Sequence, residues 1–150
     1  MAHCQDPIEI TTDLARIDLD RVHAWIARKR HWTGSMPRGV FERAVRGSLC
    51  FAALERGATI GFCRAISDRA TFAYLSDMFV DPARRGRGVG KAIMAVIMGH
   101  PELKALRLWL LVTADAQGLY ARHGFCALGA PERYMERRDA EVYQRMADEG

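Results

Sequence analysis

The sequence has no apolar run that approaches the roughly 20 residues needed to span a bilayer. Its cysteines, Cys4, Cys50, Cys63 and Cys126, include no C-x-x-C pair, so we expect no metal site. No motif places a base beside any of them, which argues against a nucleophilic cysteine. The N-terminus lacks the basic-then-apolar order of a secretion signal. We therefore expect a cytoplasmic protein with no membrane partner.

Repeats, linkers and low-complexity stretches are also missing, so we assign residues 1–150 to one domain. Apolar residues make up 49% of the chain and charged residues 27%. This composition is that of a folded domain and argues against disorder. The formal net charge of +4 suits an anionic ligand or partner, but it does not identify one.

The hydrophobic pattern predicts a mixed chain of strands and helices. The predicted strands cover 8–16, 49–54, 59–66, 71–80 and 106–113, with one or two more in 125–137, and the predicted helices cover 18–29, 38–46, 88–99, 115–123 and 139–149. Short polar turns between the three central strands favour an antiparallel meander. A strand, a helix and another strand after residue 71 predict a parallel pair in a right-handed βαβ unit.

The most informative segment is the turn between the strand that ends at Val80 and the helix that follows. Gly86, Gly88 and Gly90 alternate there. Glycine lets successive backbone N–H groups converge without interference from a Cβ atom, and such a concave turn binds anions. The helix N-terminus adds a partial positive charge at the same place. The segment therefore predicts an anion site.

Three cations crowd this helix start: Arg85, Arg87 and Lys91. A cation near a helix N-terminus is disfavoured by about 0.3–1 kcal/mol. Three of them together suggest a compensating ligand such as a polyphosphate. The alternative is a glycine turn whose arginines are solvated. The same arginines would be the contacts of a nucleic-acid binder, but no aromatic residues are interleaved with them, so we expect no nucleic acid.

Two other phosphate-binding glycine motifs do not fit. A P-loop requires a glycine where Arg85 stands and a serine or threonine where Ala92 stands. The dinucleotide motif G-x-G-x-x-G fails because Lys91 or Ile93 occupies the place of its last glycine.

The sequence Arg85-x-x-Gly88-x-Gly90 resembles the Q/R-x-x-G-x-G/A signature of the GNAT acetyltransferase superfamily. A second block, residues 116–125, is similar to the family's A-x-x-L-Y-x-x-x-G-F motif. The resemblance covers roughly residues 49–125. It implies an α/β (α+β) fold with a mixed, mostly antiparallel central sheet of about six or seven strands, about four flanking helices, and a βαβ crossover at the coenzyme site.

The resemblance also implies acetyl-CoA as co-substrate. The residues implied for its diphosphate are Arg85, Gly86, Arg87, Gly88, Val89, Gly90 and Lys91. The end of the preceding strand, Met78 to Val80 with Phe79 between them, would pair with the pantetheine arm through its backbone. Thr113 stands where many relatives have an asparagine that contacts the coenzyme, and a threonine can replace only part of that contact.

Tyr120 occupies the family's position for the acid that protonates the leaving sulfur. Its reference pKa of about 10 keeps the phenol protonated at neutral pH, although a packing tyrosine is the alternative. A backbone N–H near Phe79 or Val80 would stabilise the oxyanion. Asp77 is a candidate to orient a water or bind the substrate ammonium, but a structural aspartate fits equally well. A water relay could serve as the base.

The acceptor implied by the family is a primary amine, and we expect a small molecule rather than a protein. Trp32 in a loop could hold an amine by a cation–π contact. Tyr74 stands where some relatives have a glutamate, and we assign it to the substrate site. A homodimer is compatible with the family, many of whose members dimerise. The alternative function is a non-catalytic sensor that binds acyl-CoA and regulates a partner.

Overall fold

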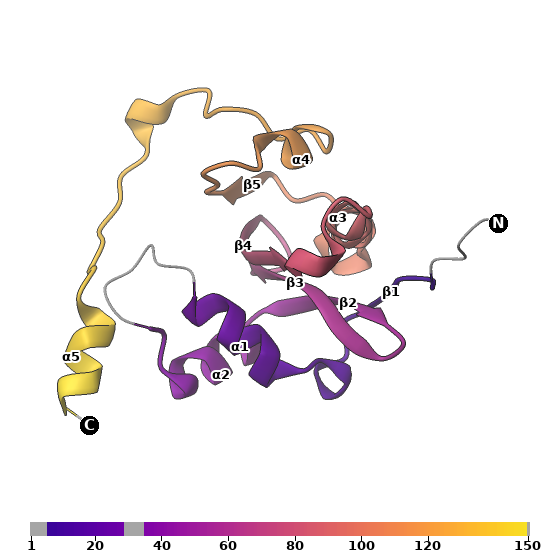
Figure 1. Cartoon of the computed structure of the whole chain (residues 1–150). Helices are drawn as coiled ribbons and strands as arrows, with labels where there is room; N and C mark the ends of the chain where they lie inside the picture. Colours follow the sequence, from indigo (N-terminus) through magenta and orange to yellow (C-terminus); the bar gives the residue numbers. More distant parts are fainter. Residues whose placement is uncertain (1–5, 29–34, 150) are drawn as a thin grey trace.

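The computed structural model describes residues 6–28 and 35–149 (Figure 1). Its strands are β1 (Glu9–Thr11), β2 (Leu49–Glu55), β3 (Ala58–Ser67), β4 (Phe72–Val80) and β5 (Leu108–Leu111). Its α-helices are α1 (Leu19–Ala27), α2 (Arg38–Arg46), α3 (Val89–Gly99), α4 (Gln117–Ala121) and α5 (Val142–Glu149). None of the helices in these ranges is long and apolar enough to cross a membrane.

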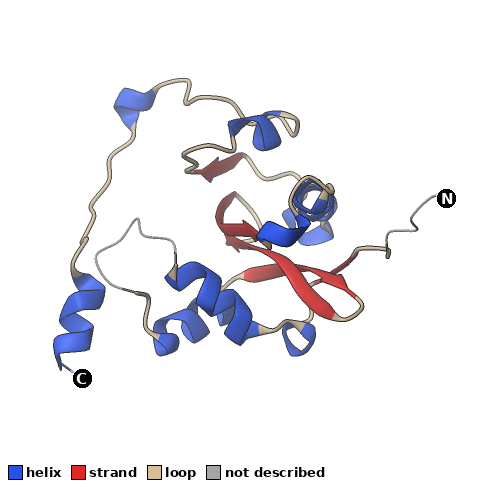
Figure 2. Ribbon diagram, viewed as in Figure 1, coloured by secondary structure: helices blue, strands red, loops and turns tan. Residues whose placement is uncertain are grey.

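The five strands form one sheet in the order β1-β2-β3-β4-β5. The first three pairings are antiparallel and the β4–β5 pairing is parallel. The antiparallel meander and the βαβ unit through α3 are therefore confirmed. Helices α1 and α2 cover one face of the sheet and α3 covers the other (Figures 1 and 2).

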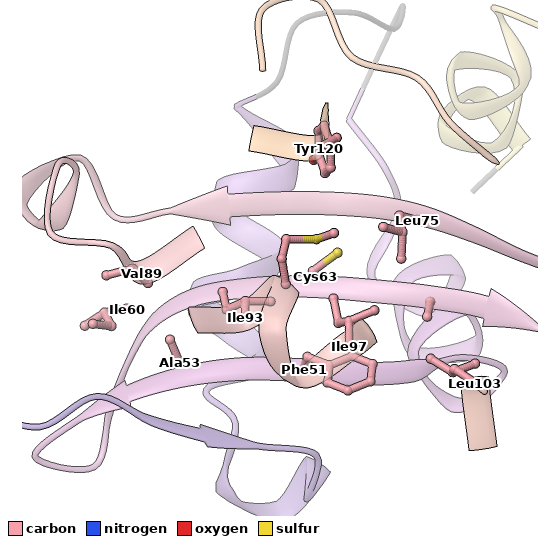
Figure 3. Packing of buried hydrophobic residues seen from close by; sticks show 12 residues of the cluster. Phe51, Ala53, Ile60, Cys63, Leu75, Val89, Ile93, Ile97, Leu103 and Tyr120 are labelled. Carbon is pink, nitrogen blue, oxygen red and sulfur yellow. The ribbon is translucent and has the colours of Figure 1, made fainter. Parts of the chain in front are cut away.

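Helix α3 buries its apolar stripe against the centre of the sheet. Its residues Val89, Ile93, Met94 and Ile97 are fully or almost fully buried, and they pack on strand residues that include Phe51 (Figure 3). Each such side chain contributes about 1.5–3 kcal/mol when it is removed from water. This packing fixes the position of the α3 N-terminus, where the glycine turn ends.

One glycine makes this close packing possible. A Cβ atom on Gly61 of β3 would lie 2.9 Å from Cγ1 of Val89 and 3.0 Å from Cδ1 of Ile93. Both side chains are buried and cannot withdraw into solvent. Gly61 therefore lets the first turn of α3 lie directly on the sheet.

The opposite face holds a second core. Val22 and Trp25 of α1 and Phe41 of α2 pack against it together with Phe62 of β3. The Trp25 ring also stacks on Phe79 of β4, with ring centroids 4.8 Å apart. Helix α1 thus contacts β4 close to the end that leads into the glycine turn.

The strand count of about six or seven is wrong, because the described chain has five strands. Residues 125–137, where we predicted one or two further strands, form none. Pro131–Arg133 form a 3-10 turn, and residues 134–139 have no regular secondary structure (Figure 2). The predicted strand over 8–16 is shorter, since it ends at Thr11. The Asp13 carboxylate accepts a hydrogen bond from the Ala15 N–H at 3.0 Å and begins a 3-10 turn. Aspartate side chains favour such local bonds over a sheet ladder.

We expect Gly61→Ala to lower the free energy of unfolding by about 1–3 kcal/mol, because the added methyl group overpacks the contact with Val89 and Ile93. Urea unfolding followed by circular dichroism measures this loss. Gly39→Ala is the matched control, since a Cβ atom there meets nothing within 4 Å and alanine favours a helix. A Gly61→Ala protein as stable as the wild type would show that α3 does not depend on this contact.

Candidate functional site

The site begins at a bulge in β4. Phe62 pairs with Phe79, but Arg64 pairs with Ser76, so β4 has two residues where β3 has one. The bulge is at Asp77, whose φ of 60° lies in the left-handed region. Aspartate is among the few residues other than glycine that adopt this conformation readily. The extra residue reverses the alternation of side chains in the rest of the strand.

Simple alternation along β4 would put Tyr74, Ser76, Met78 and Val80 on one face, and the bulge overturns this pattern. Leu75 packs in the core beneath α3, and after the bulge Met78 and Val80 join that same core. Tyr74 is half-buried on the face opposite Leu75. Simple alternation could not reveal the bulge, because no glycine or proline marks it in the sequence.

The pairing of β4 with β5 ends just before the bulge, at Leu75 and Leu111. Within the described chain, the rest of β4 pairs only with β3. The β4–β5 ladder thus ends before Met78, Phe79 and Val80. An extended ligand can bind along the end of a strand as an added strand.

An ion pair holds the bulge. Arg64 Nε donates to Asp77 Oδ2 at 2.8 Å, and both side chains are largely buried. The same guanidinium donates through Nη1 to Ser48 Oγ at 2.9 Å. Ser48 lies between α2 and β2, so Arg64 ties the bulge to that junction. This ion pair supports the interpretation of Asp77 as a structural aspartate rather than a contact for water or substrate.

The turn after β4 is also anchored by carboxylates. Asp81 accepts hydrogen bonds from the Ala83 N–H at 3.0 Å, from Arg84 Nη1 at 3.0 Å and from Arg21 Nη2 at 2.9 Å. The Ala83 N–H, followed by the charges of Arg84 and Arg21, holds the pKa of Asp81 below its ordinary value. A carboxylate that stays ionised fixes the start of the turn to α1.

Glu55 at the end of β2 anchors the middle of the turn. Its Oε2 accepts from Arg87 Nη2 at 2.7 Å, and its Oε1 accepts from Arg84 Nη2 at 3.5 Å. The negative charge that we expected a ligand to bring to these arginines thus comes in part from Glu55 of the protein itself. Sequence spacing gave no signal of this, because Glu55 and Arg87 are 32 residues apart.

Arg85 and Lys91 are placed differently. The Arg85 guanidinium lies over the Phe79 ring, 5.6 Å from its centroid, and its Nε donates to the Val80 carbonyl at 3.4 Å. The side chain is bound to the end of β4 rather than extended over the turn. Lys91 is exposed on the first turn of α3.

The backbone of the turn fits an anion. Gly86 and Gly88 both have φ of 79°, and a Cβ atom on either would meet nothing within 4 Å. Gly88 is the N-cap of α3 and provides no side-chain cap. The first N–H groups of α3 therefore point into open space with the positive end of the helix dipole behind them. Arg87 Nε is buried without a hydrogen-bond partner in the described chain.

Tyr120 on α4 lies near this turn. A Cβ atom on Gly90 would be 3.4 Å from Leu119, so α4 packs close against the first turn of α3. Tyr120 is 7% exposed, and burial raises the pKa of its phenol to about 12. The phenol is thus a protonated acid at every physiological pH.

Thr113 connects β5 to α4. Its Oγ1 accepts from the Ala116 N–H at 3.0 Å and so begins the helix. The N-cap of α4 is Ala116, which has no side-chain cap of its own. Thr113 and Tyr120 both line a groove of about 910 Å³ along β5.

The described residues thus bring together most of the predicted site. Tyr120 shares the core beneath α3 with Met78 and Val80, and the glycine turn leads from the end of β4 into the α3 N-terminus. Trp32 lies outside the described residues. Within the described ranges, no group of three or more His, Cys, Asp or Glu residues could hold a metal ion.

Comparisons with known proteins agree with this geometry. The family model for the acetyltransferase (GNAT) domain matches residues 46–127. A crystal structure from Xanthomonas campestris pv. campestris, assigned to the GNAT acetyltransferases, is 41% identical and has a TM-score of 0.87. It covers 93% of this chain and 98% of its own.

More distant relatives extend the match. A Gibberella zeae protein, named as an inferred acetyltransferase, is 25% identical, and the match covers 76% of each chain. Glucosamine-6-phosphate N-acetyltransferase from Arabidopsis thaliana is 14% identical with a TM-score of 0.63, covering 89% of this chain and 98% of its own. That last likeness shows the fold alone. The matched domain model and the 41% identical structure confirm the resemblance seen in the two motifs: the chain belongs to the GNAT acetyltransferase family and is an N-acetyltransferase.

Proposed function

We propose that the chain transfers the acetyl group of acetyl-CoA to the primary amine of a small molecule, by direct attack within a ternary complex. Membership of the family implies acetyl transfer from acetyl-CoA. The observations that support the finer proposal are an uncapped helix N-terminus at the turn after β4, a β4–β5 ladder that ends before Met78, and a buried, protonated phenol that shares a core with Met78 and Val80.

In this proposal the coenzyme is held by backbone groups. The turn residues 85–91 donate N–H groups to the diphosphate, and the backbone of Met78 to Val80 pairs with the pantetheine arm. Arg87 and Arg84 position the turn through Glu55. Thr113 already supplies its Oγ1 as acceptor to the Ala116 N–H, so its hydroxyl hydrogen is what it can offer the coenzyme.

Acetyl-CoA supplies a thioester whose carbonyl carbon accepts the amine and whose sulfur then leaves. We assign stabilisation of the negative charge on the carbonyl oxygen to the backbone N–H of Phe79 or Val80. The Tyr120 Oη donates its proton to the leaving sulfur. A phenol with a pKa of about 12 is always available in the protonated form.

In our proposal a water relay carries a proton from the substrate ammonium to bulk solvent, and the neutral amine then attacks. Asp77 acts as a positioning residue, because its Oδ2 is paired with Arg64 and holds the bulge in β4. We assign the acceptor to the face of β4 that carries Tyr74, and Trp32 stays a predicted contact outside the described residues. A cation–π contact to one aromatic ring contributes about 0.5–2 kcal/mol.

We expect Gly88→Trp to abolish binding of acetyl-CoA, because the indole would fill the open space in front of the α3 N-terminus. Gly88→Ala is the matched control: it has the same left-handed strain but only one methyl group, and should weaken binding less than about tenfold. Isothermal titration calorimetry measures both. Wild-type affinity in folded Gly88→Trp would remove the turn from the coenzyme site.

We expect Tyr120→Phe to keep its affinity for acetyl-CoA and to lower kcat by about 10²-fold or more. In the wild type the acidic form of Tyr120 persists up to its pKa of about 12, so kcat should show no descending limb from this phenol below about pH 11. Thiol release measured against pH tests both statements. Tyr143→Phe on α5 is the control for loss of a hydroxyl. Unchanged kcat in Tyr120→Phe would exclude it as the acid.

The role of Asp77 can be separated from that of a base. We expect Asp77→Asn and Arg64→Met each to lower the free energy of unfolding by about 3–5 kcal/mol, because each removes one partner of a largely buried pair. If Asp77 only holds the bulge, both variants should change kcat equally and leave its pH profile in place. If Asp77→Asn alone removes the fall of kcat at acidic pH, the carboxylate is instead the base.

The sensor alternative gives a different result. Tight binding of acetyl-CoA to the wild type, with no thiol release across a broad panel of small amines and amine-bearing peptides, would favour a regulatory role. Thiol release with peptides alone would move the acceptor from small molecules to proteins.

A further inference from the structure

A row of apolar side chains crosses three strands beside the proposed site of transfer. Tyr74 of β4 lies directly opposite Ile66 of β3 and Leu110 of β5. Residues that lie opposite each other in neighbouring strands point to the same face of the sheet. We call Ile66, Tyr74 and Leu110 the apolar row. It is one position away from Leu75 and Leu111, where the β4–β5 ladder ends.

The apolar row points away from α3. Its neighbours along the three strands, Ala65, Leu75 and Leu111, pack in the core beneath that helix, and successive side chains of a strand point to opposite faces. The row is therefore on the same face as α1 and α2, yet none of its members packs in the core that those helices form. Ile66 is 39% exposed, and the other two members are half-buried. Part of the apolar surface of the row thus faces solvent.

Two features connect the apolar row with the proposed reaction. The next pair on the same face is Arg64 with Ser76, directly before the bulge at Asp77. Leu110 also lines the groove of about 910 Å³ that Tyr120 lines. An acceptor whose amine reaches the end of the β4–β5 ladder would therefore lay the rest of its structure along the row.

The charges beside the apolar row argue against an acceptor with several ammonium groups. The only acidic residues in β3, β4, β5 and the turn between β3 and β4 are Asp68 and Asp77. Asp77 is paired with Arg64 at 2.8 Å. Asp68 accepts hydrogen bonds from backbone N–H groups of residues 70–72 and from Thr71 Oγ1. A second ammonium group would find no free carboxylate on these strands, and removing a charge from water without a partner is costly.

We propose that the acceptor is a primary monoamine with an apolar body, bound along the apolar row. The inference rests on the proposed transfer to a small-molecule amine and names the substrate class. Neighbouring strands lie about 4.8 Å apart, so a row across three strands spans about 10 Å and suits an alkyl or arylalkyl chain of about six carbons. The Tyr74 ring lies at the middle of this floor.

Two amines of equal length test this substrate class. Hexylamine and 1,5-diaminopentane differ only at the far end, where a methyl group in the first replaces an ammonium group in the second. We expect kcat/KM of the wild type for hexylamine to exceed that for 1,5-diaminopentane by about tenfold or more. Thiol release at saturating acetyl-CoA measures both values. The diamine has two reactive ends, so the statistical factor acts against the expected result.

A carboxylate placed in the apolar row should reverse the preference. In Ile66→Glu, KM for hexylamine should rise by about tenfold and KM for 1,5-diaminopentane should fall, with little change in kcat, because the row contacts the body of the acceptor rather than the reacting atoms. Val96→Glu on α3 is the matched control. Val96 is 37% exposed, and a carboxylate there should leave both KM values unchanged. Isothermal titration calorimetry should give wild-type affinity for acetyl-CoA in both variants, which shows that they fold.

The outcomes separate this inference from the proposed transfer. A wild-type kcat/KM for 1,5-diaminopentane that equals or exceeds the value for hexylamine overturns the monoamine class and leaves acetyl transfer to amines intact. A folded Ile66→Glu protein with wild-type KM values for both amines removes the apolar row from the acceptor site. Binding of acetyl-CoA without thiol release for any amine overturns the proposed transfer itself, and this inference with it.

Discussion

The bulge at Asp77 is the constraint on which the rest of the site depends. β4 has one extra residue relative to β3 at this point, and its pairing with β5 ends at Leu75. The backbone beyond that point is where we propose that the pantetheine arm binds. The bulge persists because Arg64 neutralises Asp77 within a largely buried setting and connects it to Ser48. Without that ion pair, nothing would offset the strain of a left-handed aspartate within the strand.

A second constraint acts at the start of α3. Gly61 lets the first turn of α3 lie on the sheet, and Leu119 of α4 packs against Gly90. These two contacts bring the uncapped N-terminus of α3, the end of β4 and the helix that carries Tyr120 together. The chemistry proposed for the protein needs all three features at one place.

The charges of the turn show that the sequence argument for an anion site was incomplete. The crowding of Arg85, Arg87 and Lys91 suggested an outside anion, yet Glu55 neutralises Arg87, and Arg85 packs on Phe79. In our proposal the anion is bound instead by backbone N–H groups, whose positions the side-chain charges do not indicate. The arginines stabilise the turn that presents those groups.

The sequence by itself determined the local features. Periodicity placed α2 and the three central strands, and the two glycine-containing motifs identified the family, because a turn with left-handed residues needs glycine at fixed positions. Only the tertiary structure decided the features that join distant residues: the bulge at Asp77, the pairing of Glu55 with Arg87, and the close contact at Gly61. Each of these depends on a partner many residues away, and hydrophobic alternation within one segment carries no information about such a partner.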